Sequence, residues 1–288
     1  MRKPSIKMTR RSCQLFIIVL FIAIPILNKN RYSLFYGNLL SFHFWIIPLA
    51  DPLAVLQLIL KNLSITLDSL VGALLVLSVA FFLGTVFCSW ICPYGFFSEL
   101  AVNFGKKILG RRSNDTVKGR AGFRCKLVIF MAGIVLFLVF STTPVLNQLS
   151  MPAWYTRFFQ YLFGQGYVSL SILVILALLV MEFFVRERLW CRYICPQSVL
   201  ISLVKRLNRK RLRVVFDQQR CKCKGSRDPC AIACTLSLKP KMVGNVSEIE
   251  CTNCGDCVVT CSKIGQALTF ARGTDRREDD ENQQGEKS

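Results

Sequence analysis

Four long apolar segments, separated by polar and mostly basic stretches, dominate the first two thirds of the chain. They run from Cys13 to Leu27, from Leu70 to Phe87, from Leu127 to about Val145, and from Tyr167 to Val185. Apolar runs of about this length are typical of membrane-spanning helices. No small-residue cleavage site follows the first run, so we interpret it as an anchor rather than a cleaved signal peptide. The pattern predicts four transmembrane helices.

A further apolar and aromatic stretch, Tyr32 to Leu60, lies between the first two segments and is interrupted by Pro48, Asp51 and Pro52. The interruptions favour an interfacial or re-entrant segment on the outer side rather than another span. The stretch contains His43, the single histidine of the chain. His43 and Asp51 are the candidate proton acceptors on this side, although a lone histidine at an interface is more often merely solvated.

Basic residues concentrate in alternate connections between the apolar segments. Five Lys and Arg residues precede the first segment and eight lie between the second and third, against three and one in the two other connections. This asymmetry predicts that both termini lie in the cytoplasm of a multi-pass inner-membrane protein. The net charge of +20 is then directed at the membrane, and nucleic-acid binding is not expected. Within the fourth segment we expect Arg186 to neutralise Glu182 across one helical turn.

The second and fourth segments end in the same motif, Cys-x-x-x-Cys-Pro, with thiols at Cys88, Cys92, Cys191 and Cys195. Cysteines four apart share a helix face, and proline restricts the residue before it, so each pair is predicted to end a helix at the cytoplasmic interface. The repetition predicts two duplicated helical hairpins. The four thiols are expected to converge and to hold a metal or cluster, or to form a dithiol redox pair. Alternatively, they are buried small hydrophobic residues.

A different cysteine pattern follows the membrane region, with Cys251, Cys254, Cys257 and Cys261 spaced by two, two and three residues. This spacing is typical of a peptide that wraps a cubane 4Fe-4S cluster, and the glycine at 255 suits the tight loop. The alternative is a zinc knuckle. Zinc sites usually pair two Cys-x-x-Cys hooks and do not place a third cysteine between them, which favours the cluster.

A second run contains Cys221, Cys223, Cys230 and Cys234. In ferredoxins with two clusters, the fourth cysteine of each run ligates the other cluster. We therefore predict one cluster held by Cys251, Cys254, Cys257 and Cys234, and another held by Cys221, Cys223, Cys230 and Cys261. The usual positions of two ligands of the latter are occupied by Lys224 and Arg227, so this cluster requires a longer loop, or it is absent or a different species with an open iron.

The predicted architecture is an α-helical membrane protein of four transmembrane helices with a small α+β module of the two-cluster ferredoxin type. Residues 1–212 form the membrane domain, 213–271 the iron–sulfur module, and 272–288 an acidic disordered tail. Nearly all of the fourteen cysteines have metal-ligand spacing, which favours reduced thiols over disulfides.

Several motifs together resemble the NapH/MauN-like quinol dehydrogenase family, the ferredoxin-type membrane components of periplasmic nitrate reductase systems. The resemblance rests on Leu49-Ala-Asp51-Pro52-Leu, Phe87-Cys88-Ser-Trp-Ile-Cys92-Pro93, Trp190-Cys191 with Cys195-Pro196, and the two terminal cysteine runs. It implies a subunit that oxidises a membrane quinol and passes electrons toward a periplasmic reductase, such as nitrate reductase, through an iron–sulfur or cytochrome subunit. Quinol oxidation requires a proton acceptor, for which His43 and Asp51 are the candidates.

Two other functional classes compete with this interpretation. An accessory protein for copper reduction or handling, or for maturation of a respiratory enzyme, would use the interfacial thiols to reduce or transfer the metal. It should bind copper and not react with quinol. A membrane sensor would need a sizeable outer ligand domain, and the short outer connections argue against it.

Overall fold

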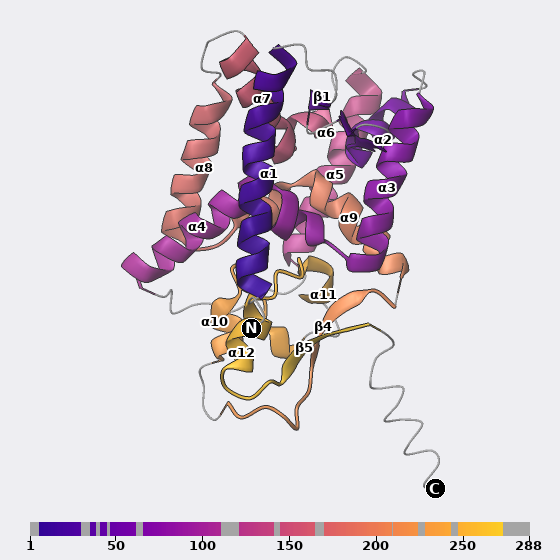
Figure 1. Ribbon diagram of the computed structural model, residues 1–288. Helices are drawn as coiled ribbons and strands as arrows, with labels where there is room; N and C mark the ends of the chain where they lie inside the picture. The colour runs from indigo at the N-terminus through magenta and orange to yellow at the C-terminus, as the bar shows by residue number, and fades with distance from the viewer. Residues whose placement is uncertain are drawn as a thin grey trace, which may run out of the picture.

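The protein forms a helical bundle with a small cysteine-rich module attached at one end, as the computed structural model shows (Figure 1). The structure describes residues 6–29, 35–38, 41–44, 47–61, 66–110, 121–140, 145–164, 170–208, 210–223, 228–242 and 247–272. The described part of the chain is mostly helical, as the sequence predicts.

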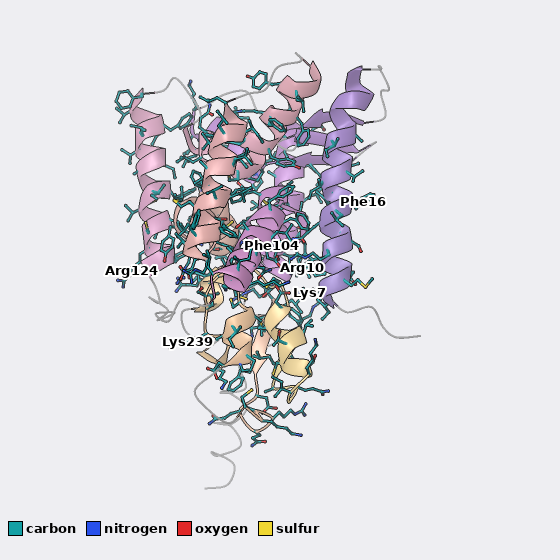
Figure 2. All side chains as sticks on the ribbon, turned by 90° about the vertical axis from the view of Figure 1, so that its left-hand side faces the viewer. Lys7, Arg10, Phe16, Phe104, Arg124 and Lys239 are labelled. Atoms are coloured by element: carbon teal, nitrogen blue, oxygen red, sulfur yellow. The ribbon has the colours of Figure 1, made fainter. Side chains whose placement is uncertain are left out.

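Each of the four predicted apolar segments corresponds to one long helix of the bundle. They are α1 (Ile6–Lys29), α3 (Leu67–Leu83), α5 (Ala121–Phe140) and α8 (Ser171–Val185). Large apolar side chains remain exposed on all four, among them Phe16, Phe82, Val128 and Leu173. Figure 2 shows Phe16 projecting away from the bundle, whereas Arg10 of the same helix lies toward the module end.

By length and composition, one described helix, Gly122–Phe140, is suited to crossing a membrane. Leu67–Leu83 and Ile172–Val185 are apolar but shorter. Four transmembrane helices therefore remain a prediction.

The two Cys-x-x-x-Cys-Pro motifs begin helices, contrary to the prediction that they end them. Helix α3 stops before its motif at Gly84 (φ 77°), and α8 stops at Arg186, which is left-handed (φ 63°). Each motif then forms one π-helical turn, η1 (Phe87–Ile91) or η2 (Trp190–Ile194). The wider turn separates the thiols from the preceding helix, and single π-helical turns are frequent at functional sites.

The second cysteine of each motif is the residue immediately before a new helix. Cys92 N–H donates to the carbonyl five residues back at 3.0 Å, and Cys195 N–H does the same at 2.9 Å. Proline then opens α4 (Pro93–Ile108) and α9 (Pro196–Leu207) at a position where no N–H donor is needed. Proline in this motif starts a helix instead of terminating one.

The helices that follow the two motifs exchange partners. Helix α4 packs on α8, and α9 packs on α3, so each half of the repeat packs against the other half. The α4–α8 contact is close, because a Cβ at Gly105 would lie 2.2 Å from the Phe183 carbonyl oxygen. Across the other contact, Asn208 Nδ2 donates to the Phe81 carbonyl at 3.1 Å. This exchange brings the two thiol motifs to the middle of the bundle.

The end of the bundle away from the module carries a small antiparallel sheet. Its strands are β1 (Phe35–Asn38), β2 (Ser41–Phe44) and β3 (Ile47–Ala50), in that order. His43 is paired with Tyr36 and Pro48 along the backbone, but its side chain lies outside the described residues. Helices α2 (Pro52–Leu60), α6 (Val145–Gln148) and α7 (Met151–Gly164) complete this end.

The module is built on a two-stranded antiparallel sheet, β4 (Leu212–Phe216) and β5 (Leu268–Arg272). The short elements between the strands are α10 (Pro229–Ala233), η3 (Pro240–Met242), α11 (Ser247–Glu250) and α12 (Asp256–Ser262). Its core combines Val214 and Leu268 with cysteine side chains, so sulfur replaces much of the usual apolar packing. The predicted tail lies outside the described residues, except for Arg272 at the end of β5.

Candidate functional site

One group of four cysteines in the module surrounds a single small cavity. Cys234, Cys251, Cys254 and Cys257 all line it, and the cavity volume is about 30 Å³. Gly255 adopts φ 81° between two of them, a conformation that favours glycine. The Leu238 N–H donates to Cys234 Sγ at 3.4 Å. These are the four residues predicted from sequence as one ligand set.

The other predicted set is also gathered within the module. Cys221, Cys230 and Cys261 belong to one packed cluster, and Cys223 lies close enough to Cys221 and Cys261 to interact electrostatically. Ligation of one cluster by these four cysteines remains a prediction. Lys224 and Arg227, which occupy the usual ligand positions in sequence, lie outside the described residues.

Both sets have the donor chemistry that an iron–sulfur cluster needs. Burial raises the pKa of Cys230, Cys234, Cys254 and Cys257, so that without a metal these thiols retain their protons. Iron supplies positive charge that stabilises the thiolate form, and cluster binding would therefore release protons. Four cysteines are the ligand type and number that a cubane cluster takes, and one of the two sets lines a common cavity.

The four thiols of the repeated motif converge in the bundle. Cys88, Cys92, Cys191 and Cys195 line one cavity of about 30 Å³, which we call the thiol cavity. Burial raises the pKa of Cys88 to about 11 and that of Cys92 to about 12. Convergence of the two motifs is the arrangement that the sequence repeat predicts.

Positive side chains surround the thiol cavity and would stabilise thiolates or an anionic cluster. Arg188 Nη2 donates to Cys191 Sγ at 3.4 Å, and Arg188 Nε donates to Ser98 Oγ at 3.3 Å. Lys126 and Arg192 also line the cavity and are buried. Within the described ranges, no group of three or more His, Cys, Asp or Glu side chains is arranged to hold a metal ion.

The loop that carries Cys251 rests directly on the turn that carries Cys88. Thr85 Oγ1 donates to the Cys251 carbonyl and Ser89 Oγ donates to the Thr252 carbonyl, both at 2.6 Å. Lys205 Nζ, buried in α9, also donates to the Cys251 carbonyl at 2.9 Å. We call Cys234, Cys251, Cys254 and Cys257 the Cys251 group. Thr252 and Leu236 line both the thiol cavity and the cavity of the Cys251 group, so one layer of residues separates the two cavities.

A buried ion-pair network fixes the module to the first helix. Arg10 Nη2 lies 2.8 Å from Glu99 Oε1 of α4 and 3.0 Å from both carboxylate oxygens of Asp256 of α12. The side chain of Arg10 is 0% exposed and that of Glu99 is 1% exposed. Arg11 Nη2 contacts the same Glu99 oxygen at 2.6 Å. Arg10 therefore joins the module to α4, and Arg11 contacts α4 beside it.

The predicted pairing of Glu182 with Arg186 is wrong. Glu182 is fully buried, its Oε1 accepts from the Trp190 N–H at 3.1 Å, and Arg188 is the neighbouring positive charge. Arg186 terminates α8 in a left-handed conformation and donates to the carbonyls of Leu109 and Gly110. The helix ends at this residue, so a spacing rule for continuous helices does not apply.

Asp51, a candidate proton acceptor, lies beside the motif region and not at the outer surface. It is the N-cap of α2, and its Oδ1 accepts from the Leu53 N–H at 3.0 Å. Gln197, two residues after Cys195, also hydrogen-bonds this carboxylate. Burial raises the pKa of Asp51 to about 6. Sequence reasoning missed Gln197, although a polar residue next to the Cys-Pro pair is a signal that could have indicated it.

Comparison with known proteins places the repeated motif in an iron–sulfur context. A family model described as "4Fe-4S binding domain" matches residues 65–112 and 168–214. The two matches begin 103 residues apart, as do Cys88 and Cys191, which confirms the sequence repeat. Both matched ranges end before Cys221, so the match includes the motif thiols and not the cysteines of the module.

Several relatives match most of the chain. The Escherichia coli protein named "Ferredoxin-type protein NapH" is 28% identical over 88% of this chain and 85% of its own. The Methylobacillus flagellatus protein named "Methylamine utilization ferredoxin-type protein MauN" is 27% identical over 82% of this chain and 81% of its own. The Escherichia coli protein YccM, whose name describes electron transport, is 28% identical over 85% of this chain, which spans only 61% of YccM. No solved structure matches the chain.

Proposed function

We propose that this chain, which is similar over most of its length to the ferredoxin-type proteins NapH and MauN, takes electrons from a membrane quinol and passes them through protein-bound iron–sulfur clusters toward a periplasmic reductase. The relatives and the family match support iron–sulfur electron transfer. The quinol, a reductase such as nitrate reductase, and an iron–sulfur or cytochrome partner subunit are the more specific parts of the proposal.

One observation carries the proposal: three groups of four cysteines lie in succession. Cys221, Cys223, Cys230 and Cys261 form the second set, the Cys221 group. The Cys221 and Cys251 groups both contribute to the core of the module, and Thr252 and Leu236 separate the Cys251 group from the thiol cavity. Electron carriers must lie within tunnelling reach of one another, so adjacent cysteine groups favour a chain of redox centres over unrelated metal sites. The clusters would be held by Cys221, Cys223, Cys230 and Cys261, and by Cys234, Cys251, Cys254 and Cys257.

The surface of the bundle supports insertion in a membrane. Exposed large apolar side chains occur along α1, α3, α5 and α8, and such extensive apolar surface is rare on soluble monomers. At the module end, Lys7, Lys106 and Arg124 belong to the basic segments that flank these helices. We propose that this end lies in the cytoplasm, following the excess of basic residues there.

Analysis of iron, sulfide and copper in the purified full-length protein, isolated without oxygen, tests the proposal. We expect about eight irons from the two module clusters, and more if the thiol cavity also holds iron. Cys254→Ser should remove the electron paramagnetic resonance signal of one cluster. Cys125→Ser is the matched control, because Cys125 is exposed and lies in neither ligand set.

Quinol titration under the same conditions tests the source of the electrons. Reduction of the clusters by a quinol supports the proposal. Clusters that dithionite reduces and no quinol reduces would contradict quinol oxidation. Stoichiometric copper in place of iron would favour the alternative accessory role in metal handling.

A further inference from the structure

A cavity of about 400 Å³ lies beside the thiol cavity, between α1, β3, α3 and α9. Most of its lining is apolar, with Ile17, Leu75 and Phe87 among the contributors. Its volume is within the range of sites that bind small organic molecules. We propose that this cavity binds the ring of a lipid-soluble quinol, with Asp51 as the proton acceptor and Gln197 as a second hydrogen-bonding group. This inference rests on the proposed function and locates its substrate.

Two buried oxygens in the lining have no hydrogen-bond partner in the structure. They are Asp51 Oδ2 and Gln197 Oε1, on residues that are 8% and 3% exposed. Ser78 also lines the cavity, but its hydroxyl donates to the Leu75 carbonyl at 2.7 Å. Buried acceptors without donors are unfavourable, so they indicate a ligand that donates hydrogen bonds. A quinol carries hydroxyl donors, whereas the oxidised quinone offers only acceptors.

One side of the cavity opens among apolar side chains. Leu49, Leu75 and Val79 line the cavity and are also exposed on the surface of the bundle. They belong to the face that we propose contacts lipid. A ligand that enters here meets apolar side chains first, which suits an isoprenoid tail and not a water-soluble substrate.

The opposite side of the cavity adjoins the sulfur atoms. Phe87, Pro152 and Gln197 line both this cavity and the thiol cavity. A ring that occupies the large cavity is therefore separated by single side chains from the cavity lined by Cys88 and Cys195. Asp51, which the sequence predicts on the outer side, therefore lines a cavity that adjoins the one lined by the motif cysteines, which the sequence predicts at the cytoplasmic interface.

Oxidation of the quinol in this cavity needs a proton acceptor and electron acceptors, which Asp51 and the proposed iron–sulfur clusters supply. The quinol loses two electrons and two protons to become the quinone. The O–H bond nearest Asp51 breaks and its proton passes to Asp51 Oδ2, while the O–H bond at the opposite end of the ring breaks and its proton passes to water. The electrons leave singly toward the iron–sulfur centres, each of which gains one electron. Burial prepares Asp51 for this role by raising its pKa above the usual carboxyl value.

The test uses full-length protein with its clusters, in detergent, reduced either by decylubiquinol or by dithionite. Asp51→Asn retains a good N-cap for α2 but cannot accept a proton. We expect its reduction by decylubiquinol to be slowed about 10²–10³-fold, with reduction by dithionite unchanged. Asp68→Asn is the matched control, because Asp68 is exposed in the first turn of α3 and does not line the cavity.

A second variant tests the location independently of proton transfer. Ala80, which is buried and lines the cavity, is replaced by Met to fill part of the space. The decylubiquinol concentration for half-maximal rate should rise at least about tenfold, by the loss of apolar contact area. Full cluster absorbance and normal reduction by dithionite show that the variant is folded.

The outcomes separate this inference from the proposed function. If decylubiquinol and other quinols fail to reduce the wild-type clusters, quinol oxidation itself is wrong. If quinol reduces the wild type and Asp51→Asn at rates within twofold, the assignment of Asp51 is wrong while the proposed function stands. An Ala80→Met protein with unchanged quinol dependence, or a cavity that holds only a lipid acyl chain, would place the quinol elsewhere.

Discussion

Replacing Arg10 with Met should release the module from the bundle. The guanidinium group is completely buried and bridges Glu99 of α4 and Asp256 of α12. In Arg10→Met, Glu99 retains Arg11 at 2.6 Å, whereas Asp256 loses its contacts at 3.0 Å and is left as a buried charge. The cost should therefore come mainly from Asp256.

The expected loss of stability depends on a known difference: removing one partner of a buried ion pair costs much more than replacing both partners with apolar or neutral groups. Removing one partner of a buried pair typically costs about 3–5 kcal/mol. We expect the lower end, about 3 kcal/mol, because Glu99 keeps a partner; this is a change of roughly 150-fold in an equilibrium constant. Arg10 Nε and Nη1 are themselves buried without partners, so the intact network also carries a desolvation cost. Arg10→Met combined with Asp256→Asn should therefore recover much of the loss.

Thermal unfolding in detergent, followed by cluster absorbance and by protease cleavage of the module, measures this effect. Arg124→Met is the control, because Arg124 is exposed at the start of α5 and lies away from Arg10 (Figure 2). An Arg10→Met protein within about 0.5 kcal/mol of the control would refute the network as the attachment of the module. A double variant less stable than the single one would show that the cost does not arise from an unpaired Asp256.

The remaining predictions concern helix packing, proton transfer and module docking. Gly105→Val should cost at least about 2 kcal/mol, because a Cβ would meet an α8 carbonyl, whereas Asn103→Val on the exposed face of α4 should cost under about 1 kcal/mol in thermal unfolding. Cluster reduction by quinol should accelerate as pH rises through about 6 and then level off, because Asp51 must be deprotonated to accept a proton, and this pH step should vanish in Asp51→Asn. Burial is the main cause of the raised Asp51 pKa, and hydrogen bonds from the Leu53 N–H and Gln197 oppose it. A reduction rate that falls as pH rises through about 6 would contradict Asp51 as the proton acceptor. Lys205→Met should leave the Cys251 carbonyl with one donor fewer and make the module more sensitive to protease. A variant whose module is cleaved as slowly as that of the wild type would contradict this prediction.

The helical bundle and both cysteine groups of the module follow from local patterns. Apolar runs predict α1, α3, α5 and α8 because helix formation is decided by residues that are close together in the sequence. Cysteine spacing predicts the module sets because short loops hold their sulfur atoms together, and Cys234 joins the Cys251 group as expected from the ferredoxin pattern. Ligation by iron remains a prediction for these residues.

Features that depend on tertiary contacts could not be predicted. The π-helical turns and the exchange of α4 and α9 reverse the expected role of the Cys-Pro pairs, because Gly84 and Arg186 end the preceding helices first. The same early ending turns Arg186 away from Glu182. Gln197 and Arg10 acquire their partners from segments far along the chain, which no spacing rule reveals.

The exchange of helices explains why a duplicated motif forms one site and not two. Each thiol pair begins a helix that packs on the long helix preceding the other pair, so Cys88 and Cys191 face a common space. Because α9 crosses to α3, it also carries Gln197 to Asp51 at the beginning of α2. A single topological feature therefore brings together cysteines from both halves and a carboxylate from the connection between α1 and α3. Proton acceptance and electron acceptance can then occur on adjacent sides of one ring, without a redox carrier crossing the bundle.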